Sequence, residues 1–154
     1  MRALIGFALV LLLAVNSVQA AGDGPPGLVT KASPYSVERT LDRLAAALEE
    51  KGITVFARVS HSGGAADVGI DLRPTELLIF GNPKVGSHFF TSRQTAGIDL
   101  PMKALAWQDA DGQVWLGYND PAYIAERHGI GDRADTVKKM TKALEALTDR
   151  ALRR

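Results

Sequence analysis

The sequence predicts an α+β domain, a single compact two-layer unit in which short strands, including a hairpin, pack against helices. Two observations carry this prediction. Helical and strand patterns alternate along the chain, which brings helices and sheet together in one domain. An Asp111-Gly112 pair between segments 103–108 and 113–118 is a strong turn signal for a hairpin, which a purely parallel sheet would lack. The length of 154 residues fits one domain.

The first segment reads as a signal peptide. A positive start at Arg2 precedes the uncharged apolar run 3–15, and Val18 and Ala20 fit the small-residue pattern before a cleavage point. The run is shorter than the roughly 20 residues of a membrane span. We therefore expect a signal peptide at 1–20, cleavage after Ala20, and an exported protein, periplasmic or secreted, with no membrane attachment after cleavage.

Residues 21–32 follow as a flexible Gly/Pro-rich leader that ends in a possible first strand at 28–32. Ser36 is a good helix N-cap, and apolar residues then recur at helical spacing until Gly52, a natural residue to follow a helix. The β-branched and aromatic content of 53–59 predicts a strand.

The middle of the chain predicts a flexible turn at Ser62-Gly63-Gly64 and a short helix over 65–70. The continuous apolar run 77–80 indicates a strand buried on both faces, which leads into Gly81–Ser87 and a helix over about 85–94.

The hairpin strands come next, each with two distinct faces. Asn119-Asp120-Pro121 caps a short helix that reaches His128. The segment 131–154 predicts a C-terminal helix that packs on the same domain, with Val137, Met140, Leu144 and Leu147 on its apolar side.

Five stretches in this order and spacing resemble one bacterial and archaeal family. They are Tyr35–Leu41, Gly52–Arg58, Arg73–Lys84, Asp99–Lys103 and Trp115–Pro121. Over residues 33–130 the chain is similar to the domain of unknown function 302 family, and its Phe-Gly-Asn-Pro-Lys-x-Gly element, Phe80–Gly86, is specific. The resemblance implies a compact α+β fold and no established activity. This sequence departs from the family at Ser60, where an acidic residue usually precedes the histidine.

Composition excludes several classes of function. The chain contains no cysteine, which excludes disulfides, thiolate metal sites and cysteine nucleophiles. It has 18 basic and 17 acidic residues, and removal of Arg2 with the signal peptide leaves 17 of each. A nucleic-acid binder would show a basic excess, so no nucleic-acid partner is expected. The spacing of His61, His88 and His128 is no metal signature, so no metal site is expected.

The best candidate site is the Gly81–Ser87 junction between a buried strand and a helix. Free backbone N–H groups at a helix N-terminus favour anions, Lys84 adds a charge and Ser87 a hydroxyl. We therefore expect a non-enzymatic module that binds a small anionic ligand near Asn82, Lys84, Ser87 and His61. The other interpretation is a tight turn, because turn chemistry alone explains the glycine, asparagine and proline without a ligand.

Two alternatives remain open from the sequence. One is an envelope enzyme, a hydrolase or isomerase, with His61 as general base and Lys84 as electrostatic stabiliser, which requires the two side chains to face one cleft. The other is a homodimeric envelope interaction protein that associates through strand edges or Trp115. The sequence identifies no cofactor and no catalytic residue beyond this pair.

Overall fold

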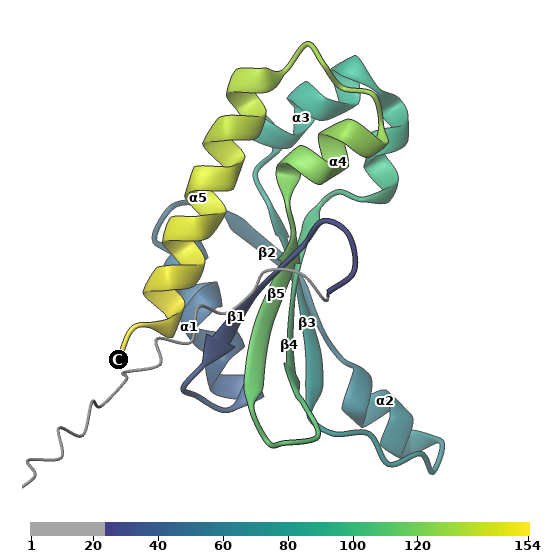
Figure 1. The fold of residues 1–154 in the computed structure, drawn as a ribbon, viewed down its shortest axis with the longest axis vertical. Helices are drawn as coiled ribbons and strands as arrows, with labels where there is room; N and C mark the ends of the chain where they lie inside the picture. Colours follow the sequence, from purple (N-terminus) through teal and green to yellow (C-terminus); the bar gives the residue numbers. More distant parts are fainter. Residues whose placement is uncertain (1–23) are drawn as a thin grey trace, which may run out of the picture.

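The computed structural model describes residues 24–154 (Figure 1). The predicted signal peptide at 1–20 and the first residues of the leader lie outside this range. The described chain runs through the following elements: β1 (Leu28–Ser33), α1 (Val37–Glu49), β2 (Thr54–Ser60), α2 (His61–Asp67), β3 (Thr75–Gly81), α3 (Pro83–Ser92), the 3-10 helix η1 (Gln94–Ile98), β4 (Met102–Gln108), β5 (Val114–Asn119), α4 (Pro121–Arg127) and α5 (Ala134–Leu152). This order confirms the α+β prediction.

The five strands form one sheet in the order β1-β5-β4-β3-β2, and every neighbouring pair is antiparallel. The predicted hairpin is present, since β4 pairs with β5 and Trp107 lies directly opposite Trp115. The first strand pairs with the last, which places the N-terminal strand at the sheet edge. Strand β2 forms the other edge and carries an irregularity between Val55 and Ala57.

Helices α1 and α5 cover one face of this sheet, so the domain has two layers (Figure 1). Alternation along β4 and β5 points Ala104, Ala106 and Leu116 at the helices, and all three are fully buried. The small alanines let α1 approach the sheet closely, and Leu41 and Leu44 of α1 are fully buried there. These side chains, packed between the sheet and the helices, form the hydrophobic core of the domain.

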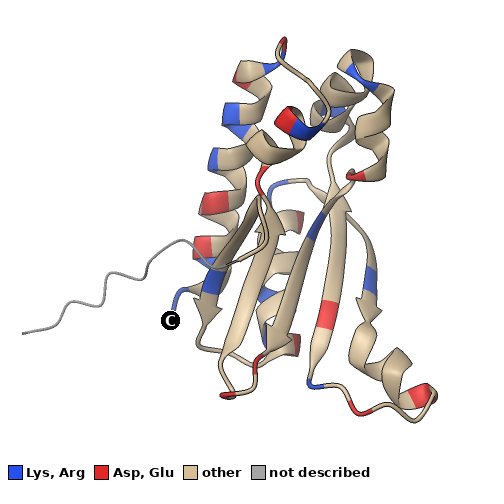
Figure 2. Ribbon diagram, turned by 45° about the vertical axis from the view of Figure 1, so that its right-hand side comes forward, with Lys and Arg blue, Asp and Glu red and all other residues tan. Residues whose placement is uncertain are grey.

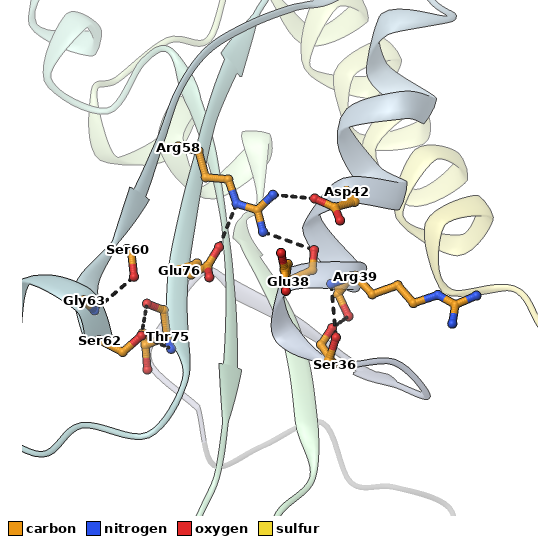
Figure 3. A network of polar contacts seen from close by, with 11 residues as sticks. Ser36, Glu38, Arg39, Asp42, Arg58, Ser60, Ser62, Gly63, Thr75 and Glu76 are labelled. Carbon is orange, nitrogen blue, oxygen red and sulfur yellow. Dashed lines mark hydrogen bonds and ion pairs between the residues drawn. The ribbon is translucent and has the colours of Figure 1, made fainter. Parts of the chain in front are cut away.

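A polar network ties α1 to the β2 edge (Figure 3). The Arg58 guanidinium donates from Nε to Glu76 Oε2 (2.7 Å), from Nη1 to Asp42 Oδ1 (2.5 Å) and from Nη2 to the Glu38 carbonyl (3.1 Å). The forked shape of arginine suits such a set of acceptors. Arg58 therefore fixes the position of α1 over the edge of the sheet, where the apolar core thins out.

The prediction for segment 61–70 is wrong in its boundaries. Helix α2 begins at His61 and ends at Asp67, so the glycines expected to form a flexible turn lie inside it. The reason is local: Ser60 is the N-cap, and its Oγ accepts a hydrogen bond from the Gly63 amide at 3.0 Å. This cap places the helix directly after β2 and outweighs the poor helix propensity of Gly63 and Gly64.

Candidate functional site

A cavity of about 430 Å³ opens where β3 passes into α3. Its walls come from four regions: the turn before β2 and β2 itself, the β3–α3 junction, the start of β4, and α5. The lining residues are Lys51, Ile53, Phe56, Phe80, Gly81, Asn82, Pro83, Val85, Gly86, Ser87, Phe90, Leu100, Pro101, Met102, Lys139, Met140, Ala143, Leu144 and Leu147.

The chemistry of this wall is mostly hydrocarbon. Three phenylalanines, Phe56, Phe80 and Phe90, line it together with aliphatic and methionine side chains. The charged lining residues are Lys51, from the turn that follows α1, and Lys139, from α5, and none of the lining residues that the structure describes is acidic. Within residues 24–154, neither lysine takes part in an ion pair. The cavity therefore combines an apolar interior with two uncompensated positive charges.

The predicted junction forms one wall of this cavity. Asn82 is the N-cap of α3: its Oδ1 accepts from the Lys84 amide at 3.0 Å, and its carbonyl accepts from the Val85 and Gly86 amides at 2.9 Å. Asn82 thus satisfies the helix N-terminus from within the chain, as turn chemistry alone would require. Ser87 also lines the cavity, whereas Lys84 is exposed and is not part of the wall.

His61 does not belong to this site. Thr54 of β2 pairs with Gly81, at the cavity, whereas Ser60 pairs with Glu76 at the other end of β3. The six-residue rise along β2 separates the two ends by roughly 20 Å. The expectation that His61 and Lys84 face one cleft is therefore wrong, because antiparallel pairing places the end of β2 beside the start of β3. The enzyme hypothesis, which requires His61 and Lys84 to face one cleft, is therefore wrong as well.

Sequence reasoning missed Lys51, Lys139 and the three phenylalanines as site residues. They come from the turn after α1 and from β2, β3, α3 and α5, which long-range packing brings together, and no motif links them. The sequence does show three lysines, Lys138, Lys139 and Lys142, in the C-terminal helix, but such lysines are typical of a solvated helix face.

Across residues 24–154, no group of three or more histidine or carboxylate side chains could hold a metal ion. Among the same residues, no helix has both the length and the apolar character needed to cross a membrane.

Two curated relatives match the same extent of the chain. One is "Fluoride-specific ion channel FluC 1" of Brucella suis biovar 1 (strain 1330), which is 49% identical over 113 residues, 73% of this chain and 44% of that protein. The other, with the same name, comes from Brucella abortus biovar 1 (strain 9-941), with 49% identity over 113 residues and 42% of that protein. The chain thus spans less than half the length of these relatives.

A solved structure shares the fold. The crystal structure of an uncharacterized conserved DUF302 protein from Bacillus stearothermophilus superposes with a TM-score of 0.74 at 21% identity, and covers 82% of this chain and 99% of that one. The sequence model described as "Domain of unknown function DUF302" matches residues 29–147, well over half of the chain. The protein therefore belongs to the DUF302 family, as its motifs predict.

Proposed function

We propose that this protein is a non-enzymatic binding module for a small amphipathic anion. The apolar part of the ligand lies in the cavity beside the Gly81–Ser87 junction, and its negative group lies between Lys51 and Lys139. The observation that carries this proposal is the composition of the wall: apolar side chains, two lysines without ion-pair partners in the described chain, and no acidic lining residue. Binding sites for small molecules are commonly apolar pockets with a few convergent polar groups.

The size of the cavity sets the size of the ligand. Sites for small molecules span about 300–1,000 Å³, so 430 Å³ lies at the small end. At roughly 30 Å³ for each group of water size, the cavity takes about 14 such groups. A medium-chain carboxylate such as decanoate, with about 12 non-hydrogen atoms, is of this size. Burial of its methylenes would supply most of the affinity, at about 0.8 kcal/mol each.

The predicted site residues have unequal parts in this proposal. Asn82 and Ser87 form part of the wall and offer polar atoms beside the ligand. Lys84 lies outside the wall, so its role as the positive group passes to Lys51 and Lys139. His61 has no part, since it lies at the far end of β2.

The first test measures decanoate binding by calorimetry and by thermal shift. Decanoate at about 100 times its Kd should raise the Tm by several degrees. Ala143→Trp, which places an indole at the cavity wall on α5, should abolish binding. Ala146→Trp is the matched control, because Ala146 is also an exposed alanine of α5 but does not line the cavity. Equal binding by both variants would exclude the cavity.

The second test separates charge from apolar burial. Decanol and decyltrimethylammonium carry a similar alkyl group without the negative charge. Both should bind at least tenfold more weakly than decanoate. Lys51→Gln combined with Lys139→Gln should remove this preference, whereas Lys142→Gln, outside the wall, should preserve it. If all three compounds bind the unaltered protein equally, the cavity takes apolar ligands and the anionic part of the proposal is wrong.

We also propose that the protein is exported. The support is the pattern of Arg2, the apolar run 3–15 and Ala20. Expression of the full chain in a bacterium should give a mature protein that begins at Ala21 and is recovered from the periplasm or the medium. An intact mass that still includes residues 1–20 would contradict cleavage.

A further inference from the structure

The segment 61–74, here called the protrusion, lacks a buried core of its own. It consists of α2 and the loop to β3, and no residue of α2 is buried. Three large apolar side chains of the loop are exposed: Val68 (70%), Ile70 (60%) and Leu72 (43%). Figure 1 shows the protrusion extending away from α1 and α5 at the lower right. A seven-residue helix is not stable by itself in water, and exposed apolar clusters commonly mark interaction sites.

The attachment of the protrusion to the sheet is well defined. The Ser60 cap fixes the start of α2, and the Thr75 amide donates to Ser62 Oγ at 3.3 Å (Figure 3). The apolar side chains at 68–72 are therefore held at a fixed place beside the start of β3.

The face of the sheet opposite α1 and α5, here called the open face, is also apolar. Since Ala104, Ala106 and Leu116 point at the helices, their neighbours along the strands point the other way. The partly buried members of the open face in the three central strands include Leu77, Ile79, Leu105, Trp107 and Trp115. The two tryptophans occupy directly opposite positions in the β4–β5 register.

Charge is nearly absent from the open face. Figure 2 shows few charged residues along the strands, and these are Lys31, Arg58, Glu76 and Lys103. Lys31 bonds to α5, and Arg58 and Glu76 belong to the network with α1, so these three lie on the helix side. Lys103 belongs to the open face, where its Nζ donates to its own chain, to the Asp99 carbonyl at 2.8 Å and the Pro101 carbonyl at 3.0 Å.

The protrusion and the indoles meet at one end of the sheet. Thr75, where the protrusion enters β3, pairs with Trp107, and Trp107 pairs with Trp115. The Trp115 indole N–H donates to Asp109 Oδ2 at 2.7 Å, so it needs no external partner. One chain thus carries a projection with exposed apolar side chains beside an apolar platform in which the Trp115 indole and the Lys103 ammonium already have hydrogen-bond partners.

We propose that the protein forms a two-fold dimer in which the protrusion of each copy packs on the Trp107–Trp115 end of the other copy's open face. A second copy is the fitting occupant because the open face requires no complementary charge and because one two-fold axis covers both features at once. Five strands at ~4.8 Å spacing and about six residues at ~3.3 Å give a flat area of roughly 480 Å². This is the area of the whole face, so the protrusion has to supply the rest of the ~800 Å² per partner of a standard interface.

Light scattering after gel filtration tests the dimer across a concentration series. The unaltered protein should be a dimer at tens of micromolar. Ile70→Asp should be a monomer, with a dissociation constant raised at least a hundredfold, and Val68→Asp should behave alike. The matched control is Ile98→Asp: Ile98 is 74% exposed, comparable to Ile70, but lies in η1, which leads to the opposite end of β4. The control should remain a dimer.

Tryptophan emission supplies a second readout, because the chain has two tryptophans and both lie on the open face. Dilution of the unaltered protein should shift the emission to the red as the dimer dissociates, and Ile70→Asp should show the red-shifted emission at every concentration. A monomer at all concentrations, a dimer that survives Ile70→Asp, or dissociation without an emission change would overturn the proposal. Because neither readout needs a ligand, failure here leaves the proposed binding function untouched.

Discussion

The His128 Nε2 and the Asp99 Oδ2 lie 2.6 Å apart, and the two side chains are largely buried, at 7% and 13% exposure. A carboxylate can only accept, so Nε2 donates to Asp99, and Nδ1 shares a hydrogen bond with the Thr95 hydroxyl at 3.1 Å. Asp99 also accepts from Arg127 at 3.2 Å. This contact joins the residue before the cis Leu100-Pro101 peptide to the C-terminal end of α4.

The first prediction concerns this pair. Asp99→Ala should lower the free energy of unfolding by about 1–3 kcal/mol, because it leaves a buried imidazole N–H without an acceptor. Asp99→Asn should cost less, since the amide oxygen can still accept. Urea denaturation measures both. Asp132→Ala removes an exposed carboxylate that pairs with Ser92 and should change stability by under about 1 kcal/mol. Equal costs at positions 99 and 132 would contradict a stabilising role for the buried pair.

The second prediction is a pH dependence centred on Asp109. The hydrogen bond from the Trp115 indole holds the pKa of the Asp109 carboxyl below its ordinary value, and the Gln113 and Asp111 amides act in the same direction. A depressed carboxyl pKa stabilises the fold above the ordinary value near 3.8 and loses this contribution as the pH falls through the depressed value. Asp109→Asn should therefore show a smaller loss of stability on acidification below about pH 5. Urea midpoints across pH 2–6 measure it, and identical pH profiles would count against it.

The third prediction tests the Arg58 network of Figure 3. Arg58→Lys keeps the charge but loses the fork that reaches Asp42, Glu76 and the Glu38 carbonyl together, so it should cost about 1 kcal/mol. Arg150→Lys is the control: Arg150 pairs with Glu50 alone, and both side chains are about half exposed. It should be close to neutral. A neutral Arg58→Lys would show that the network orients α1 without stabilising it.

Local signals predicted the elements that depend on neighbours in sequence. Ser36 was expected to cap the first helix, and its Oγ accepts from the Arg39 amide at 3.2 Å. The Asp111-Gly112 turn gave the hairpin, with Gly112 at a φ of +82°. Such features require a few adjacent residues and no knowledge of the rest of the chain.

Only part of the candidate site could be predicted from the sequence, because the rest of it depends on residues that are far apart in the chain. The Gly81–Ser87 junction was found because its residues are contiguous, and it does form a wall of the cavity. Lys51 and Lys139 were not found, because their places in one cavity wall depend on how α5 packs against α1 and α3. His61 was misassigned because the strand direction of β2, which decides the end of the sheet at which it lies, is set by pairing with β3.

The last prediction uses two glycines that lie inside regular elements, where alanine should gain about 0.5–1 kcal/mol from backbone entropy alone. At Gly86 in α3 the new methyl group would meet Phe90 at 3.8 Å, an ordinary contact, so Gly86→Ala should stabilise the protein by about this amount. At Gly117 in β5 the methyl group would lie 2.9 Å from Trp107 Cζ3, with Leu28 Cδ1 at 3.4 Å on the other side.

The Trp107 ring lies over Gly117, so the added carbon forces the indole to move. Overpacking of this kind costs about 1–3 kcal/mol, which exceeds the entropic gain, so Gly117→Ala should destabilise. Thermal unfolding should therefore move in opposite directions for the two variants, and the tryptophan emission should change for Gly117→Ala alone. Shifts of the same sign would mean that Trp107 is not held against β5, and the open face would then lack the fixed indole on which the dimer depends.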